Sequence, residues 1–306
     1  MSQLHLSCSP HIHRNRTTSG IMLDVIISLL PATIAGFLIF GIKALSVVLM
    51  CVAACVLSEV IFNKIVKKEE TVGDLSAVVT GLLLGLNLTA DTPLWQTVIG
   101  AVFAIIIVKC LFGGIGCNLV NPAITARVFM ILAFSSLAKP SFPVDSVATA
   151  TPLTELASGK SVDLMQLFLG NRGGSIGETS VLALLIGGIY LLVRGVISWH
   201  MPVSMIGSVF MLSFLLDGFD FTNALAWIMS GGLFIGAFFM ATDYVTSPAT
   251  AKGKIIFGIG AGVITVLIRF YGIYPEGVSF GILLMNILNP YVNIWSRRKL
   301  FGGENK

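Results

Sequence analysis

Long apolar runs, interrupted by glycine, proline and short charged clusters, are the feature that most constrains the fold of this chain. A bilayer core of about 30 Å requires about 20 helical residues, and about ten runs approach that length. Apolar residues make up 55% of the 306 residues and charged residues only 11%, against about 25% charged in soluble domains. The sequence therefore predicts an all-α polytopic membrane protein. We expect about ten transmembrane helices near residues 21–41, 44–63, 75–88, 95–112, 120–137, 178–194, 201–216, 222–240, 255–272 and 278–295.

The positions of lysine and arginine predict the orientation of these helices, because cytoplasmic loops are enriched in both residues. If the N-terminus is cytoplasmic, twelve of these residues lie at inner helix ends and four at outer ends. We therefore expect both termini to be cytoplasmic and the loop between the halves to be extracytoplasmic. The inner residues are Arg14, Arg16, Lys64, Lys67, Lys68, Arg194, Lys252, Lys254, Arg297, Arg298, Lys299 and Lys306, and the outer ones are Lys43, Lys139, Lys160 and Arg172.

The chain also repeats itself, which predicts two halves. Asn15-Arg16 precedes one long apolar run, and Asn171-Arg172 precedes another. Each half would hold five helices, and because five is odd the second half must enter from the opposite side, as an inverted repeat. The expected parts are a cytoplasmic segment at 1–20, membrane repeats at 21–137 and 178–295, an extracytoplasmic loop at 138–177 and a cytoplasmic tail at 296–306.

Two expected spans are short or broken by glycine, namely residues 75–88 and the stretch around Gly231, Gly232 and Gly236. Broken helices at corresponding positions of inverted repeats meet near the midplane and surround a ligand or ion. Irregular backbone is tolerated in a bilayer only where protein or a polar cavity covers it. We expect a polar centre where these two spans meet.

A glycine-rich turn between Lys109 and Arg127 contains Asn118 and Asn121. Asn121 stands directly before a proline, which suits a helix N-cap and is a purely structural role. Lys109 and Arg127 would each cost about 2.5–3.5 kcal/mol at the membrane centre, so we expect them to line a cavity or a functional site. Asparagine amides also suit a ring with both donors and acceptors, such as an isoalloxazine.

Two further groups allow both a structural and a functional interpretation. Thr242 and Asp243 end an expected helix amid hydroxyl residues; they either cap it or line an ion or flavin pocket, since oxygen ligands suit hard cations. Glu276 lies near a helix start, where a carboxylate is favoured by about 0.3–1 kcal/mol. The alternative is that Glu276 pairs with Arg269 at the outer mouth.

The expected loop contains the string Asp145-Ser-Val-Ala-Thr-Ala-Thr-Pro-Leu. From residue chemistry alone its threonines are ordinary turn residues. The string resembles the Asp-x-x-Ser/Thr-Gly-Ala-Thr flavinylation signal of the Rnf and Na⁺-translocating NADH:quinone reductase families. The resemblance implies that Asp145 is the leading acid, Ala150 the small residue and Thr151 the threonine that carries FMN through a phosphoester. Ala148 and Thr149 depart from that pattern, which has Ser or Thr and then Gly at these positions.

Other motifs carry the same resemblance in the same order. They are Ser-Pro-His from Ser9, Asn-x-x-Asn-Pro-Ala from Asn118 and Tyr-Pro-Glu-Gly-Val from Tyr274. The asparagine motif lies near a non-covalent flavin, riboflavin, in the quinone reductase relatives. The resemblance thus implies that Asn118 and Asn121 contact a flavin. Lys109, Arg127, Thr242 and Asp243 are the further candidates for cofactor binding, and we expect neither a metal site nor a catalytic residue.

Membership of the RnfD/NqrB family would imply a multi-pass flavoprotein of the prokaryotic cytoplasmic (inner) membrane. Such a subunit relays electrons within a complex that couples ferredoxin:NAD⁺ electron transfer to Na⁺ or H⁺ translocation. The implied partners are other membrane and peripheral subunits, including a second flavoprotein and iron–sulfur subunits, and a flavin transferase. The chain contains no Gly-x-Gly-x-x-Gly opening a βαβ unit and no cysteine cluster for iron–sulfur ligation, so enzyme activity would belong to the complex.

The same sequence bears on three other classes of function. The net charge of +4 is small and lies at helix ends, so we expect no nucleic acid partner. A channel for urea or ammonium, or a solute carrier without flavin, would use the same inverted architecture. A purely structural scaffold would have neither flavin nor solute flux.

Overall fold

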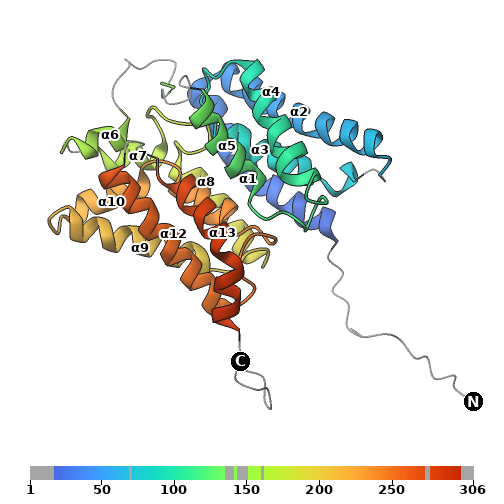
Figure 1. Ribbon diagram of the computed structural model, residues 1–306. Helices are drawn as coiled ribbons and strands as arrows, with labels where there is room; N and C mark the ends of the chain where they lie inside the picture. Colours follow the sequence, from blue (N-terminus) through green and yellow to red (C-terminus); the bar gives the residue numbers. More distant parts are fainter. Residues whose placement is uncertain are drawn as a thin grey trace, which may run out of the picture.

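The computed structural model describes residues 17–68, 71–134, 141–142, 151–159, 162–272 and 276–297. These residues form helices and connections, with one isolated antiparallel bridge between Ser141 and Gly174 and no β-strand in the described part of the chain. Figure 1 shows the helices of the two halves of the sequence as two adjoining groups. The all-α fold predicted from the apolar runs is confirmed.

Each apolar run predicted to cross the membrane is helical. The first half contains α1 (Thr18–Phe40), α2 (Ile42–Val66), α3 (Ser76–Leu86), α4 (Leu94–Val102) with its π-helical continuation η2 (Phe103–Cys110), and α5 (Pro122–Ala133). The second half contains α8 (Val181–Val193), α9 (His200–Leu216), α10 (Phe221–Met229), α11 (Leu233–Ile235) with the π-helical turn η4 (Gly236–Met240), α12 (Ala251–Tyr271) and α13 (Val278–Ser296). Between the halves lie two short helices, α6 (Pro152–Ala157) and α7 (Leu164–Leu169), and the 3₁₀ turn η1 (Val72–Asp74) precedes α3.

Helix length divides the spans into two classes. Four described helices are long and apolar enough to cross a membrane by themselves, namely α1, α2, α12 and α13. The eighth predicted span is broken: α10 and the α11–η4 segment meet at 64°. Gly231 lies at this break with φ +67, a conformation that favours glycine. The other spans are shorter apolar helices, which is typical of helices that end inside a bundle around a polar centre.

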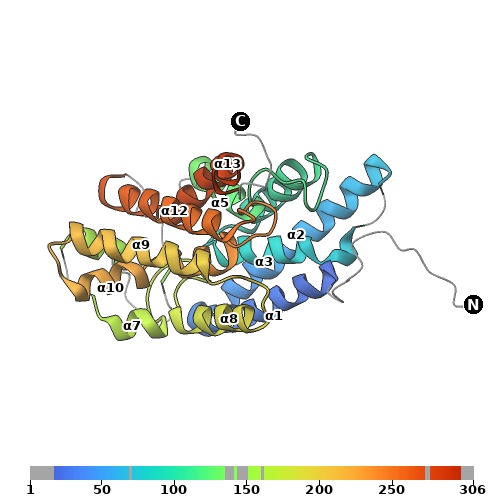
Figure 2. The ribbon, with the colours of Figure 1, turned by 90° about the horizontal axis from the view of Figure 1, so that it is seen from below.

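Contacts between the halves have the pattern of an inverted repeat. The first helices of the two halves, α1 and α8, pack together, and so do the last, α5 and α13. Figure 2 shows α1 beside α8 at one edge of the molecule and α5 beside α13 at the opposite edge. Asp24 near the start of α1 binds Arg194 at the end of α8, and Gly36 near the end of α1 contacts Ile176 ahead of α8. α1 and α8 are therefore antiparallel, as two halves of opposite orientation require.

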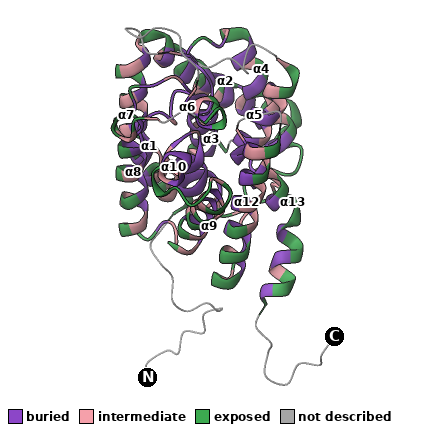
Figure 3. Ribbon diagram, turned by 90° about the vertical axis from the view of Figure 1, so that its left-hand side faces the viewer, coloured by how far each residue is buried: buried purple, intermediate pink, exposed green. Residues whose placement is uncertain are grey.

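The outer surface is apolar and the interior holds the charges. Figure 3 shows the buried residues inside the helix bundle and exposed ones on its outer faces. Exposed positions on the long helices include Leu38, Ile65 and Trp295, each at least 74% exposed. A soluble monomer rarely exposes such contiguous apolar surface, whereas lipid would cover it. The chain is therefore a multi-pass membrane protein.

Candidate functional site

Two pockets open between the halves. The larger has a volume of about 380 Å³, within the range of about 300–1,000 Å³ of small-molecule sites. Lys109, Asn118, Asn121, Thr242 and Asp243, five of the residues predicted to bind a cofactor, all line it. We call this cavity the large pocket. Residues from separate segments of the sequence are thus brought to one cavity by the fold.

Asn121 closes one wall of the large pocket. It is the N-cap of α5, as predicted: its Oδ1 accepts from the amides of Ala123 at 3.0 Å and Ile124 at 3.3 Å. Its Nδ2 donates to the carbonyl of Met240 at 3.2 Å. The side-chain amide of Asn121 therefore caps α5 and at the same time lies in the wall of the large pocket.

Asn118 presents an acceptor that the protein does not use. Its Oδ1 is buried and has no hydrogen-bond partner among the described residues. A buried polar atom without a partner costs about 1–3 kcal/mol. A ligand with an N–H or O–H group in the large pocket would remove that cost, so this acceptor fits a flavin or another ring that carries an N–H group.

Lys109 lines the large pocket with its charge already balanced. Its Nζ donates to Glu59 Oε1 at 2.8 Å and to Ser76 Oγ at 2.6 Å. Glu59 Oε1 also accepts from Thr71 Oγ1 at 2.7 Å. Both charged side chains are 2% exposed. The sequence analysis did not single out Glu59, although a lone glutamate within the apolar run 44–63 was the available signal.

Thr242 and Asp243 follow η4 at the edge of the large pocket. The hydroxyl of Thr242 donates to the carbonyl of Phe238 at 2.6 Å, and the carboxylate of Asp243 accepts from Thr246 Oγ1 at 3.0 Å. Burial raises the pKa of Asp243, while the bond from Thr246 lowers it. Both residues therefore make local hydrogen bonds, as capping residues do, and both also line the large pocket.

The smaller cavity, which we call the loop pocket, has a volume of about 90 Å³. Thr151, Arg127, Arg172, Glu178 and Glu276 are among its lining residues. This volume suits a few waters or one small group, and it is well below that of ordinary small-molecule sites. The predicted flavin attachment residue therefore borders a small, charged cavity at the connection between the halves.

Thr151 itself is the N-cap of α6. Its Oγ1 accepts from the amide of Thr154 at 3.3 Å and lies 3.0 Å from Thr154 Oγ1. A threonine followed by a proline in the first helical turn is a common helix start. Asp145 and Ala150, the other residues of the flavinylation motif, lie outside the described residues.

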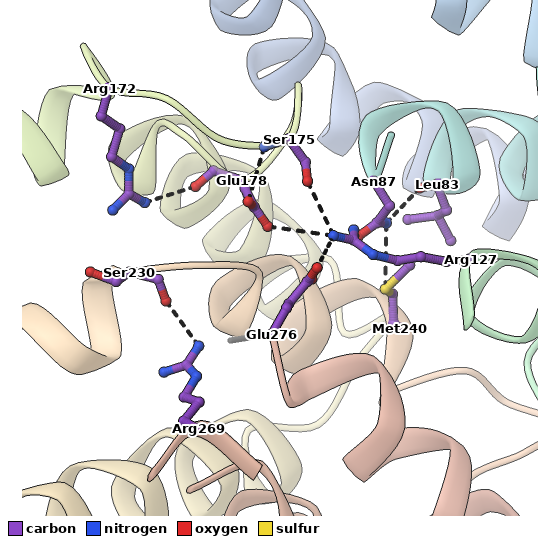
Figure 4. Close-up of polar contacts among 10 residues, drawn as sticks. All are labelled: Leu83, Asn87, Arg127, Arg172, Ser175, Glu178, Ser230, Met240, Arg269 and Glu276. Carbon is purple, nitrogen blue, oxygen red and sulfur yellow. Dashed lines mark hydrogen bonds and ion pairs between the residues drawn. The ribbon is translucent and has the colours of Figure 1, made fainter. Parts of the chain in front are cut away.

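Arg127 joins the loop pocket to the centre of the protein (Figure 4). Its guanidinium donates to Asn87 Oδ1, to Glu276 Oε2 and, at 3.1 Å, to Ser175 Oγ. Glu178 Oε2 lies 3.9 Å from the same guanidinium. Arg127 lines the loop pocket, whereas the other membrane candidates line the large pocket.

Glu276 does not form an ion pair with Arg269, which was the alternative that the sequence allowed. Glu276 binds Arg127, whereas Arg269 donates to the carbonyls of Trp227 at 2.7 Å and Ser230 at 3.0 Å. The break between α10 and α11 leaves these carbonyls without helical partners, so an arginine at the end of α12 satisfies them. Lys109, at the end of η2, donates instead to the hydroxyl of Ser76 at the start of α3.

One layer of side chains separates the two pockets. Asn87, at the end of α3, lines the loop pocket and places its Nδ2 3.6 Å from Met240 Sδ. Asn121, which lines the large pocket, contacts the carbonyl of the same methionine. The two short spans therefore meet at Met240, as their broken character predicted. This arrangement brings two polar sites close together without joining them.

The family comparison covers nearly the whole chain. The model described as the NQR2, RnfD, RnfE family matches residues 5–302. The chain is 45% identical to the D subunit of the Na⁺-translocating ferredoxin:NAD⁺ oxidoreductase complex of Acetobacterium woodii, over 99% of this chain and 97% of that protein. It is 42% identical to the D subunit of the proton-translocating complex of Clostridium ljungdahlii, over 97% and 96%. The D subunit of an ion-translocating oxidoreductase complex from Cronobacter sakazakii is 32% identical, over 97% and 98%.

Proposed function

This chain belongs to the NQR2, RnfD, RnfE family, and from that membership we propose that it is the D subunit of an ion-translocating ferredoxin:NAD⁺ oxidoreductase complex. The resemblance inferred from its motifs is confirmed at the level of the family. Within the complex, the subunit relays electrons through flavin and is part of the machinery that couples their transfer to movement of Na⁺ or H⁺. The oxidoreductase activity belongs to the assembled complex with its flavoprotein and iron–sulfur subunits.

The observation that carries the flavin assignment is the pair of pockets on either side of Met240. Thr151 borders the loop pocket, and the large pocket has the size and the polar lining for a second, non-covalent flavin such as riboflavin. A flavin supplies reversible electron transfer, and the protein supplies its binding and orientation. Two such sites separated by one side-chain layer are suited to passing electrons across the centre of the membrane domain.

The residues have separate tasks in this proposal. Thr151 carries FMN through a phosphoester, and a flavin transferase recognises the preceding motif with Asp145 and Ala150. Asn118 and Asn121 hydrogen-bond the non-covalent flavin in the large pocket. Thr242 and Asp243 line another wall of the large pocket, whereas Arg127 fixes the wall of the loop pocket.

The orientation follows from the positive-inside rule. We propose that both termini are cytoplasmic and that Thr151 is extracytoplasmic, since most lysines and arginines then lie on the cytoplasmic side. The large pocket lies toward the same side as Lys254, Arg194 and the start of α1, because Ile21 and Val196 line it. The covalent flavin would therefore face outward and the non-covalent flavin inward.

In-gel flavin fluorescence of the denatured subunit, co-expressed with its flavin transferase, tests the proposal. We expect a fluorescent band for the wild-type chain and none for Thr151→Ala at equal protein amount. Thr154→Ala is the matched control, because Thr154 lies beside Thr151 on α6 and should keep the fluorescence. A dark wild-type band would favour the channel or carrier class, and solute flux in proteoliposomes would then distinguish a channel from a scaffold.

A further inference from the structure

Arg172 is a buried arginine, and one terminal nitrogen of its guanidinium makes no hydrogen bond to the described residues. It is 8% exposed, and its Nη2 donates to the carbonyls of Glu178 at 3.0 Å and Met229 at 2.7 Å. Its Nη1 is buried and has no hydrogen-bond partner within the described ranges. Burial lowers the pKa of Arg172 to about 10, so it stays protonated at neutral pH. The two carbonyls fix the guanidinium, and the free Nη1 is a donor without an acceptor.

Arg172 lies where an acceptor on Thr151 could reach it. Both residues line the loop pocket, together with the glycines that follow Arg172 in the chain. Figure 4 shows Arg172 and Arg269 beside Glu178 and Glu276 around this region. An arginine fork binds phosphate oxygens well, because its N–H groups match their geometry.

The charges around the loop pocket do not balance. Three arginines, at positions 127, 172 and 269, are gathered with two glutamates, at 178 and 276, among the described residues. Arg269 belongs to the group because its Nη2 lies 3.1 Å from the position of a Cβ on Gly231, which lines the pocket. With all five side chains ionised, one positive charge is left over. A buried charge without compensation is strongly unfavourable.

A phosphodiester would supply the negative charge and the hydrogen-bond acceptors that this group of side chains lacks. It carries one negative charge and oxygen acceptors for Nη1, which makes the cluster neutral. The volume of about 90 Å³ suits a phosphate group, whereas an isoalloxazine ring needs a cavity of ordinary ligand size. The ring must therefore lie beyond the mouth of the pocket.

We propose that Arg172 is a positioning residue whose Nη1 donates to the phosphodiester that links flavin to Thr151, which holds the phosphate in the loop pocket and directs the ring out of it. This inference rests on the proposed covalent flavin at Thr151. It adds the anion site that orients the flavin and a residue for that task outside the flavinylation motif.

Time-resolved fluorescence anisotropy of the covalent flavin tests the role of Arg172 in the full-length protein. With the phosphate anchored, the fast local rotation of the flavin in the wild-type protein should be restricted, and most of the anisotropy should decay with the whole particle. Arg172→Gln should add a fast local component that makes up the larger part of the decay, and Arg172→Lys should lie in between. Lys43→Gln is the matched control, because it removes a positive charge from the outer side at a position where the side chain is 72% exposed.

The possible outcomes separate this inference from the proposed function. A wild-type protein without flavin on Thr151, by peptide mass analysis, contradicts both. Flavin on Thr151 with the same anisotropy in Arg172→Gln as in wild type overturns the role of Arg172 alone. If Arg172→Gln takes up no flavin, the comparison moves to the Thr151→Ala background with inorganic phosphate as probe. There a phosphate-dependent rise in Tm that Arg172→Gln removes supports the site, and no rise overturns it.

Discussion

Glu59 on α2 and Lys109 on η2 form an ion pair with 2.8 Å between Nζ and Oε1, and both side chains are almost completely buried. Because Lys109 also donates to Ser76 on α3, the pair connects three helices of the first half. The ammonium donates to both of these partners. Lys109 therefore supports the wall of the large pocket and its charge is balanced before any ligand binds.

Breaking this pair on one side should destabilise the protein strongly. Glu59→Ala or Lys109→Ala leaves one buried charge without a partner, which costs about 3–5 kcal/mol. Replacement of both, by Glu59→Leu with Lys109→Met, should recover most of that loss, because no charge remains buried. Thermal unfolding of the purified protein in detergent measures the difference. Single variants as stable as the double variant would contradict the account.

The stability of the protein should fall as Glu276 loses its proton. Burial raises the pKa of Glu276 from its ordinary 4.5 to about 7, while Arg127 lowers it and Glu178 raises it further. The folded state thus binds the proton more tightly than the unfolded state. The stabilisation of the folded state by this proton is complete below about pH 4.5 and is lost as the pH rises through about 7.

Unfolding midpoints measured across this pH range test that sign. Glu276→Gln has no proton to lose, so its midpoint should depend less on pH than that of the wild-type protein. Asp91→Asn, at a side chain that is 60% exposed, is the control and should keep the wild-type slope. Parallel curves for wild type and Glu276→Gln would rule out this role of Glu276.

The contact between the two halves should not tolerate a methyl group at Gly187. A Cβ there would lie 2.0 Å from the backbone carbonyl of Ser28 on α1, so the helices must move apart. Overpacking of this kind costs about 1–3 kcal/mol. Gly207 on α9 is the matched control, since nothing lies within 4 Å of its Cβ position.

Gly207→Ala should be neutral or stabilising by up to about 1 kcal/mol, from helix propensity alone. Expression level and Tm of the two variants give the comparison. If Gly187→Ala were as stable as Gly207→Ala, α1 and α8 would not pack in this close contact.

Asn118 should contribute to the affinity of the large pocket for non-covalent flavin. Asn118→Ala removes the acceptor that has no partner within the described ranges, which should weaken binding by about 1 kcal/mol, or roughly fivefold in Kd. Equilibrium titration of riboflavin into flavin-depleted protein measures this. Cys117→Ala, at an exposed neighbour, should bind like wild type. An unchanged Kd for Asn118→Ala would remove Asn118 from the site.

The membrane helices could be predicted from the sequence because each one is a continuous apolar run that ends at glycine, proline or charged residues. The break at Gly231 was visible for the same reason, and the N-cap of α5 was visible in Asn121 followed by proline. The helices α6 and α7 were not predicted, because each has only six residues, which is too short for a helical pattern to show.

The side-chain partners were predicted less well, because they join positions far apart in the chain. Arg127 was expected in a cavity, but its partner Glu276 lies 149 residues away. Glu59 and Glu178 were missed, since a single polar residue in a helix or a loop has an ordinary structural role in most proteins. Only the packing of α3, α5 and the connection before α8 brings Asn87 and Glu178 to the loop pocket. The packing of α2 against η2 brings Glu59 to Lys109.

The number of flavins that the purified subunit retains and releases on acid precipitation tests the central claim most directly. Wild-type protein should retain one flavin covalently and release one, and Thr151→Ala should still release one while retaining none. Such a result would show that one chain holds both a covalent and a non-covalent flavin. Wild-type protein that retains no flavin after precipitation would contradict the electron relay.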